Sequence, residues 1–165
     1  MKISSIAIAT IAGLLASMTA LAADSAAMPK VGDKAPLVEG TDQEGKPWKL
    51  SDDVGKKLVL LYFYPKDDTR GCTKEACGFR DNIDSLKADN VEVIGVSFDS
   101  GDSHLKFISK YKLNFPLIAD TDGKMYAAFG VDARTTLLIS ADGTIRKVWP
   151  KVSVAGHAED VYNSL

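Results

Sequence analysis

The sequence predicts an α/β fold in which helices cover both faces of a central mixed sheet. A continuous apolar run at 58–64 and a second segment at 91–99 are typical of strands buried on both faces. Amphipathic segments separate such runs, as expected where helices connect parallel strands. Near the C-terminus, two β-rich runs flank Asp142-Gly143, a dipeptide typical of a hairpin turn, so an antiparallel pair joins the sheet.

The N-terminal 22 residues are expected to be a secretory signal peptide. Lys2 precedes an apolar stretch from Ile6 to Leu15, and Ala20-Leu21-Ala22 fits an A-x-A cleavage site. The stretch is too short for a membrane span, and an uncleaved anchor is the alternative. Cleavage predicts a chain exported from the cytoplasm, to the periplasm where the cell has an outer membrane.

Residues 23–30 are expected to form a disordered lead-in, because they are small and bounded by proline. A single domain then runs from 31 to 165, since no internal repeat, low-complexity segment or linker interrupts it.

Local signals in the first half of the domain predict three strands and a helix. Two short strands flank the Glu44-Gly45 turn, and the buried strand at 58–64 closes at Pro65. A helix is expected from about Arg70 to Leu86, with Asn90 marking its end. The buried strand at 91–99 follows.

The second half continues the alternation. We expect a helix at 103–113, a short strand at 115–120, a helix that ends at Gly130, the hairpin at 135–149, and a last amphipathic helix at 155–165. This order of elements matches a thioredoxin-like fold.

The chain has only two cysteines, Cys72 and Cys77, both just after the first buried strand. Exported proteins tolerate structural disulfides, so a structural bridge and an inert buried cysteine are alternatives to a redox catalyst. The formal net charge of −2 gives no reason to propose nucleic acid or anionic lipid as a partner.

The predicted helix places the two thiols in different settings. At about 100° per residue, four apolar residues fall within roughly 40° of Cys72 and form one core-facing stripe: Ala76, Phe79, Ile83 and Leu86. Cys77 falls about 140° away. Cys72 lies in the first turn, where unpaired N–H groups and the helix dipole stabilise a thiolate, which makes it the candidate nucleophile.

The spacing also bears on the disulfide. Residues five apart in an intact helix have Cα atoms roughly 8.7 Å apart, whereas a disulfide requires about 4.4–6.8 Å. A bond between Cys72 and Cys77 therefore requires the helix to unwind, and we expect a continuous helix across both residues in the reduced protein.

The residues around Cys72 resemble a known family. Pro65-x-x-x-Thr69-x-x-Cys72 is similar to the P-x-x-x-T/S-x-x-C signature of peroxiredoxins. The run "FYPKDDTRGCTKEACGFRD" resembles the bacterioferritin-comigratory protein or peroxiredoxin Q subfamily, in which a second cysteine lies five residues after the first. The resemblance extends from about Val31 to the C-terminus.

The resemblance implies a thiol peroxidase that reduces hydrogen peroxide and organic hydroperoxides. Cys72 would be the peroxidatic cysteine and Cys77 the resolving one, joined in turn by an intramolecular disulfide. Pro65 would shield the pocket, the Thr69 hydroxyl would contact thiolate and peroxide, and Arg134 would be the arginine that the family places at the start of a later strand. A surface ion pair with Asp132 is the alternative for Arg134.

One position departs from the subfamily, which usually has proline where this chain has Arg70. Arg70 gives up the preset φ of a proline in the first helical turn and adds a positive charge near Cys72. A solvated side chain is the simpler interpretation of Arg70.

The expected chemistry requires no metal or organic cofactor. The two histidines, His104 and His157, lie on different segments, and two cysteines five apart do not make a zinc spacing. A thioredoxin-like or other dithiol reductant would regenerate the enzyme. Both cysteines act within one chain, so a monomer is expected.

Two rival functions follow from the same residues. An exported thiol–disulfide oxidoreductase would normally carry C-x-x-C, which the C-x-x-x-x-C spacing argues against. A non-catalytic module with a structural disulfide would require a permanently non-helical segment between the cysteines.

Overall fold

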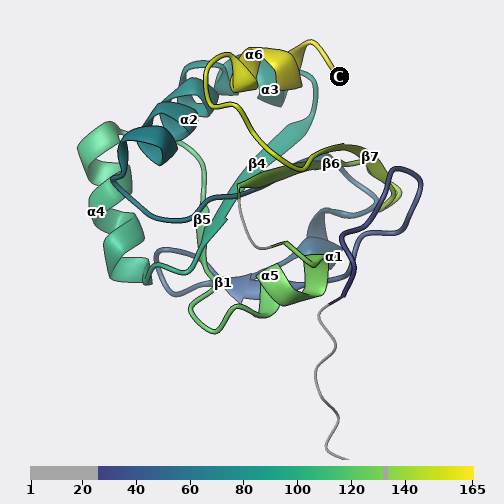
Figure 1. Cartoon of the computed structure of the whole chain (residues 1–165), viewed down its shortest axis with the longest axis horizontal. Helices are drawn as coiled ribbons and strands as arrows, with labels where there is room; N and C mark the ends of the chain where they lie inside the picture. The colour runs from purple at the N-terminus through teal and green to yellow at the C-terminus, as the bar shows by residue number, and fades with distance from the viewer. Residues whose placement is uncertain (1–25, 132–133) are drawn as a thin grey trace, which may run out of the picture.

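The computed structural model describes residues 26–131 and 134–165, and in these residues it has the predicted mixed sheet with helices on both faces (Figure 1). The five strands are, in spatial order, β5 (Leu117–Ala119), β4 (Val91–Ser97), β3 (Leu58–Phe63), β6 (Thr135–Ile139) and β7 (Ile145–Trp149). β3 pairs in parallel with β4 and antiparallel with β6, and β7 closes the predicted hairpin.

Six helices surround the sheet in the described residues: α1 (Leu50–Asp53), α2 (Arg70–Asp81), α3 (Ile83–Ala88), α4 (Gly101–Tyr111), α5 (Lys124–Phe129) and α6 (His157–Tyr162). Buried side chains of α2, α3, α4 and α6 pack on one face of the sheet, here called the α2 face. Those of α1 and α5 pack on the opposite, α5 face.

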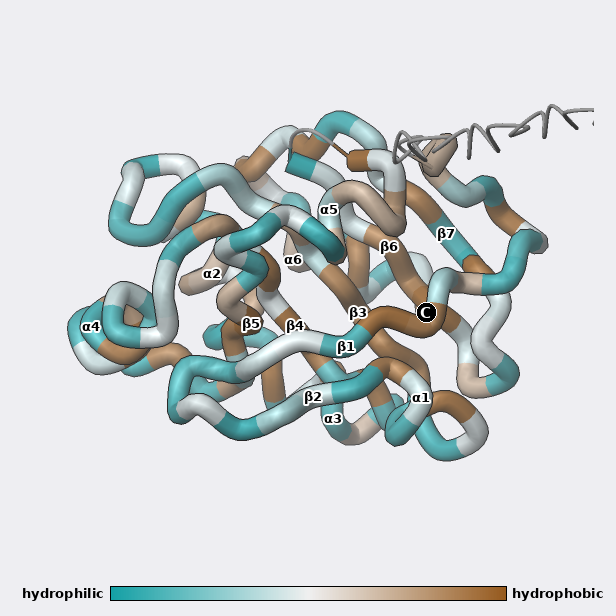
Figure 2. The backbone as a smooth tube through the Cα atoms, turned by 90° about the horizontal axis from the view of Figure 1, so that it is seen from below, coloured by the Kyte–Doolittle hydropathy of each residue, from teal (hydrophilic) through white to brown (hydrophobic). Residues whose placement is uncertain are grey.

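The central strand β3 contributes side chains to both faces. Leu60 and Tyr62 belong to the α2 face, whereas Leu61 and Phe63 belong to the α5 face, because side chains alternate along a strand. The strands β3, β4 and β6 accordingly form the hydrophobic centre of the molecule, with hydrophilic segments around them (Figure 2). This double burial explains the continuous apolar runs in the sequence.

A small antiparallel pair lies outside the main sheet. β1 (Glu39–Thr41) and β2 (Pro47–Lys49) flank the predicted Glu44-Gly45 turn, where Gly45 has φ 80°. An isolated bridge from Asp42 to Ile118 connects this pair to β5.

The helix predicted from Arg70 to Leu86 is wrong in one respect, because Asn82 divides it into α2 and α3. Asn82 has φ −104° and ψ 6°, and its side-chain amide donates to the carbonyl oxygen of Gly78 (2.9 Å). Side-chain bonds of this kind compete with the helical backbone pattern. The predicted core-facing stripe is nevertheless buried along both helices, at Ala76, Phe79, Ile83 and Leu86.

The predicted signal peptide at 1–22, and 23–25 of the predicted lead-in, lie outside the described residues. The remainder of the lead-in packs against the domain, which differs from the disorder expected for it. Pro29 is buried, and Met28 contacts the core of the α5 face. A Cβ atom at Gly130 would lie 1.9 Å from the carbonyl oxygen of Ala26, so the close approach depends on glycine. In the part of the chain that the structure describes, no helix is long and apolar enough to cross a membrane.

Candidate active site

Cys72 lies in the first turn of α2, directly after the loop that leaves the carboxyl end of β3. Thr69 is the N-cap, with extended backbone, and the first helical bond runs from the Thr73 N–H to the Thr69 carbonyl oxygen (2.8 Å). The N–H groups of Gly71 and Cys72 precede that bond and have no partner within the helix. Cys72 is 1% exposed and packs with Tyr62 and Tyr64 on the α2 face, so its sulfur is nearly dry and close to the positive end of a helix.

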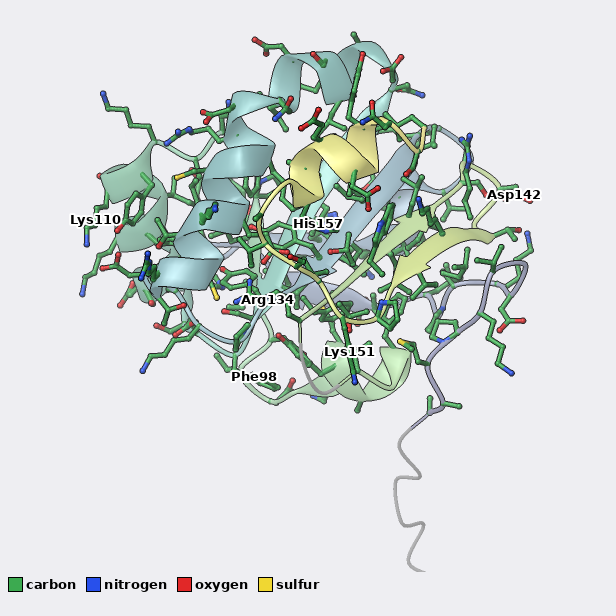
Figure 3. The ribbon with its side chains drawn as sticks, turned by 45° about the horizontal axis from the view of Figure 1, so that its top comes forward. Phe98, Lys110, Arg134, Asp142, Lys151 and His157 are labelled. Atoms are coloured by element: carbon green, nitrogen blue, oxygen red, sulfur yellow. The ribbon has the colours of Figure 1, made fainter. Side chains whose placement is uncertain are left out.

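Arg134 reaches this sulfur from a distant part of the chain. Its Nη2 donates to Cys72 Sγ at 3.1 Å. Because β6 runs antiparallel to β3, with Thr135 opposite Phe63, the residue that precedes β6 lies at the sheet edge where β3 ends. Figure 3 shows Arg134 beside the first turn of α2. The guanidinium therefore places a charged hydrogen-bond donor directly on the sulfur of Cys72.

Gly71 leaves room for that guanidinium. A Cβ atom at position 71 would lie 3.2 Å from Arg134 Nη2, which is tighter than ordinary van der Waals contact. A side chain at this position would therefore require the guanidinium to shift by a few tenths of an ångström.

Glu75 holds the other side of the Arg134 guanidinium, and the sequence reasoning missed it. Its Oε2 forms an ion pair with Nη1 of Arg134, while its Oε1 is buried without a hydrogen-bond partner. Burial raises the pKa of Glu75 to about 7, an effect that Arg134 only partly offsets. On the helical wheel Glu75 falls about 60° from Cys72, at the border of the buried stripe. A carboxylate at such a position was the available signal, since buried acidic residues are rarely unpaired.

His157 is the first residue of α6 (Figure 3). Its Nε2 is 2.9 Å from the Thr136 hydroxyl and 4.0 Å from Glu75 Oε1. The ring packs edge-on against Phe79 and Trp149. Burial lowers the pKa of His157 to about 4, so the imidazole is neutral near pH 7. A series of contacts therefore connects Cys72, through Arg134 and Glu75, to the neutral ring of His157.

Thr69 and Pro65, two other residues of the predicted site, lie in the segment between β3 and α2. The Thr69 hydroxyl donates to the Lys66 carbonyl oxygen (3.1 Å), not to the Cys72 sulfur, and thereby closes the turn before α2. Pro65 is exposed and directly follows the buried Tyr64 in the chain. Asp132, the alternative partner of Arg134, lies outside the described residues.

Cys77 is partly exposed and faces away from Arg134. It lines a groove of about 590 Å³ between α2 and α4, together with Asp68, Arg70, Thr73, Lys74, Lys110 and Tyr111. Arg70, which stands in place of the subfamily proline, is exposed at this groove. Both thiols are free, and α2 is continuous through both, as predicted for the reduced protein.

The arrangement supports nucleophilic chemistry at one sulfur. A nearly dry thiol, a cationic donor on its sulfur and the N–H groups of a helix start are together suited to stabilise negative charge that develops during attack. Within the described residues, no group of three or more His, Cys, Asp or Glu side chains is placed to hold a metal ion.

Known proteins are similar to this chain in sequence and in fold. The AhpC/TSA family matches residues 31–148. A putative Bcp peroxiredoxin from Coxiella burnetii is 46% identical over 149 residues, covering 82% of this chain and 98% of the relative. A Bcp peroxiredoxin from Escherichia coli is 40% identical, with 82% and 95% covered.

Two solved structures show the same likeness in three dimensions. Peroxidoxin BcpB from Mycobacterium tuberculosis has a TM-score of 0.77 at 33% identity, covering 82% of this chain and 95% of that one. The bacterioferritin comigratory protein of Xanthomonas campestris, described for its alkyl peroxide reduction activity, has a TM-score of 0.76 at 31% identity, with 80% and 96% covered.

Proposed function

The chain belongs to the AhpC/TSA family as a peroxiredoxin of the Bcp and peroxiredoxin Q kind, and from this membership we propose that it reduces hydroperoxides through a sulfenic acid on Cys72 that Cys77 resolves. Thiol peroxidase activity is what relatives so named share. The observation that carries the proposal is the 3.1 Å contact between Arg134 Nη2 and the nearly dry Cys72 Sγ in the first turn of α2.

The first step transfers one oxygen atom to Cys72. The thiolate attacks the terminal oxygen of ROOH, the S–O bond forms and the O–O bond breaks. The sulfur becomes a sulfenic acid, and RO⁻ takes a proton and leaves as an alcohol, or as water when the substrate is hydrogen peroxide. Arg134 and the N–H groups of Gly71 and Cys72 are the donors that stabilise charge on the peroxide oxygens.

The second step joins the two cysteines. The Cys77 thiolate attacks the sulfenic sulfur, the S–S bond forms, and the S–O bond breaks to release hydroxide, which takes a proton to become water. Because α2 is continuous through both residues, this step requires its first turns to unwind. The groove beside Cys77 opens toward solvent, which leaves that thiol accessible when Cys72 moves out.

A dithiol reductant completes the cycle. Its two thiols supply two electrons by thiol–disulfide exchange, so that Cys72 and Cys77 return to thiols and the reductant becomes a disulfide. We infer a thioredoxin-like protein as this reductant, because a pair of thiols supplies both electrons by this exchange.

The substrate class includes hydrogen peroxide and organic hydroperoxides. The alkyl peroxide reduction described for the Xanthomonas campestris relative supports the organic part of this proposal.

Compartment and assembly complete the proposal. The leader-like features of residues 1–22 support export, to the periplasm where one exists. Both reacting cysteines belong to α2 of one chain, which supports a monomer. Light scattering of the reduced protein measures that assembly state directly.

Stopped-flow fluorescence tests the reaction. Trp149 packs on His157 behind the active site, so its emission is expected to report changes there, whereas Trp48 lies on β2. Mixing the reduced protein with hydrogen peroxide should give a rapid phase, which Cys72→Ser abolishes. In Cys77→Ser the first phase should persist, and no intramolecular disulfide should form.

The same preparation separates this function from its rivals. An insulin-reduction assay run beside the peroxide assay should be slow. Rapid insulin reduction without peroxide turnover would favour a thiol–disulfide oxidoreductase. The absence of both activities, with a disulfide that resists reduction, would favour a structural bridge.

A further inference from the structure

A buried polar cluster lies under the loop that connects β3 to α2. Asp67, in the middle of this loop, is 7% exposed. Its Oδ1 accepts from the Tyr64 hydroxyl (2.7 Å), and its Oδ2 accepts from the Ser103 hydroxyl (2.8 Å). Its N–H donates to Asp99 Oδ2 (2.8 Å). The loop before Cys72 is therefore attached to β3, to the residues after β4 and to α4 through one residue.

His104 is the fully buried member of this cluster, with 0% exposure. Its Nδ1 lies 2.9 Å from Asp67 Oδ2 and 3.4 Å from the Tyr64 hydroxyl, which gives its own hydrogen to Asp67 Oδ1. Its Nε2 lies 3.2 Å from the carbonyl oxygen of Ile118. A carbonyl oxygen only accepts, and so does an ionised carboxylate. Both ring nitrogens therefore face acceptors, and each requires a hydrogen to satisfy the contact.

The carboxylate of Asp67 is suited to be the charged partner. Burial alone would raise the pKa of Asp67, but hydrogen bonds from His104, Tyr64 and Ser103 outweigh that effect and leave the pKa lowered. A neutral His104 would leave either this carboxylate or the Ile118 carbonyl facing an unprotonated nitrogen in a dry site, which is costly.

We propose that His104 is a positioning residue for the peroxide-reducing step, a buried imidazolium that pairs with Asp67 and thereby holds the loop that presents Cys72. This inference rests on the proposed function for its kinetic consequence, but not for the protonation state of the ring. The other groups facing the pair are the Tyr64 hydroxyl from β3, the Ser103 hydroxyl from α4, and Asp99 after β4.

A second contact with α4 explains why the loop needs holding. Asp68 has φ 56°, in the left-handed region that non-glycine residues rarely adopt. Lys110 Nζ lies 2.7 and 2.9 Å from its two carboxylate oxygens. The start of α4 thus binds Asp67 and its end binds Asp68, so the helix fixes the turn from which α2 begins. Without the pair at Asp67, the turn relaxes and Cys72 loses its alignment with Arg134.

The ring nitrogens give a direct test. The chain has two histidines, so a ¹⁵N-histidine spectrum of the reduced wild-type protein contains two imidazoles. Near pH 7, His104 should show a hydrogen on both nitrogens. His157 is the internal control, since burial lowers its pKa to about 4 and one of its nitrogens should be unprotonated. An unprotonated nitrogen on His104 would overturn the proposal, whether or not the protein reduces peroxide.

Variants of α4 test the kinetic consequence. His104→Leu should slow the peroxide phase roughly tenfold, the typical effect of losing a hydrogen bond to a charged group. His104→Asn retains an N–H donor near the Nδ1 position and should recover part of that loss. Ser109→Ala, on the exposed side of the same helix, is the matched control and should react at the wild-type rate.

The two chemical steps should respond differently. Disulfide formation requires the first turns of α2 to open, so His104→Leu should leave the rate of that step unchanged or faster. A wild-type peroxide rate in His104→Leu, or an equal slowing of both steps, would contradict a positioning role. If His104→Leu does not fold, Asp67→Asn takes its place, and the His104 ring should then lose one hydrogen near pH 7.

Discussion

At the residue scale, three polar side chains in contact with one another set the environment of the buried Cys72 sulfur. Arg134 touches the sulfur, and Glu75 holds Arg134 from the far side. The neutral ring of His157 then closes the series next to Glu75. Each of these groups changes a different observable when it is removed.

Replacing Arg134 by alanine should slow the peroxide reaction but leave Cys72 open to alkylation. A donor that faces developing charge is worth roughly 2.7–4 kcal/mol, or about 10²–10³ in rate. Stopped-flow measurement of the second-order rate constant checks the first part, and iodoacetamide labelling checks the second. Arg146→Ala removes an exposed arginine from β7 and is the control. Unchanged peroxide kinetics in Arg134→Ala would show that another group stabilises the charge.

Glu75 should make the stability of the fold depend on pH. Its pKa is about 7 in the folded protein and near 4.5 in an unfolded chain. Between these values the folded protein binds more protons, so the free energy of unfolding should fall as pH rises from about 4.5 to about 7. At about 1.4 kcal/mol for each pH unit, this contribution is on the order of 3 kcal/mol.

Denaturant unfolding of the wild type and Glu75→Gln at several pH values measures that contribution. The difference between their unfolding free energies should decrease with rising pH, because glutamine does not titrate. A difference that is constant from pH 4 to 8 would show that Glu75 titrates like an exposed glutamate.

At the element scale, the proposed reaction sets two requirements for α2. As a helix it positions Cys72 under Arg134 and keeps Cys77 at the groove on the other flank. To form the disulfide it must unwind. The break at Asn82 separates α2 from α3, whose Ile83 and Leu86 remain packed in the core. The unwinding is thus confined to a segment that ends before the buried part of α3.

Oxidation should therefore increase amide hydrogen exchange from Thr73 to Phe79 and lower the helix content seen by circular dichroism. Exchange in α3 should stay at its level in the reduced protein, because its core contacts are not involved. Peptide-resolved exchange of the reduced and oxidised forms measures this, and Cys77→Ser treated with the same oxidant is the control. Equal protection of α2 in both redox states would argue for a bond formed without unwinding.

At the scale of the whole molecule, the site forms where three distant segments meet at one edge of the sheet. β3 delivers the loop that leads to Cys72, β6 starts at the same edge with Arg134 before it, and α4 holds the loop from outside. β3 pairs in parallel with β4 and antiparallel with β6, and these pairings bring the three segments together at one edge of the sheet.

The complete chain should be exported and cleaved after Ala22. Cell fractionation followed by mass spectrometry should find a mature protein that begins at Ala23 outside the cytoplasm. Leu14→Arg interrupts the apolar stretch and should keep the full-length chain inside the cell. Full-length wild-type protein in the cytosol would refute export without affecting the assignment of Cys72.

Apart from α1 and the division between α2 and α3, the sequence by itself determined the order of strands and helices, the central mixed sheet and the candidate nucleophile. These features follow from local patterns: apolar runs for doubly buried strands, 3.6-residue periodicity for helices, and a signature within eight residues that ends at Cys72. Arg134 was also predicted, but through resemblance to a family, not through any pattern of its own.

Only the tertiary structure decided how charges surround the sulfur. Glu75 and Arg134 are separated by 59 positions and Asp67 and His104 by 37, and no local periodicity encodes such pairs. The physical reason is that burial creates the need for a partner, and long-range strand pairing decides which residue supplies it.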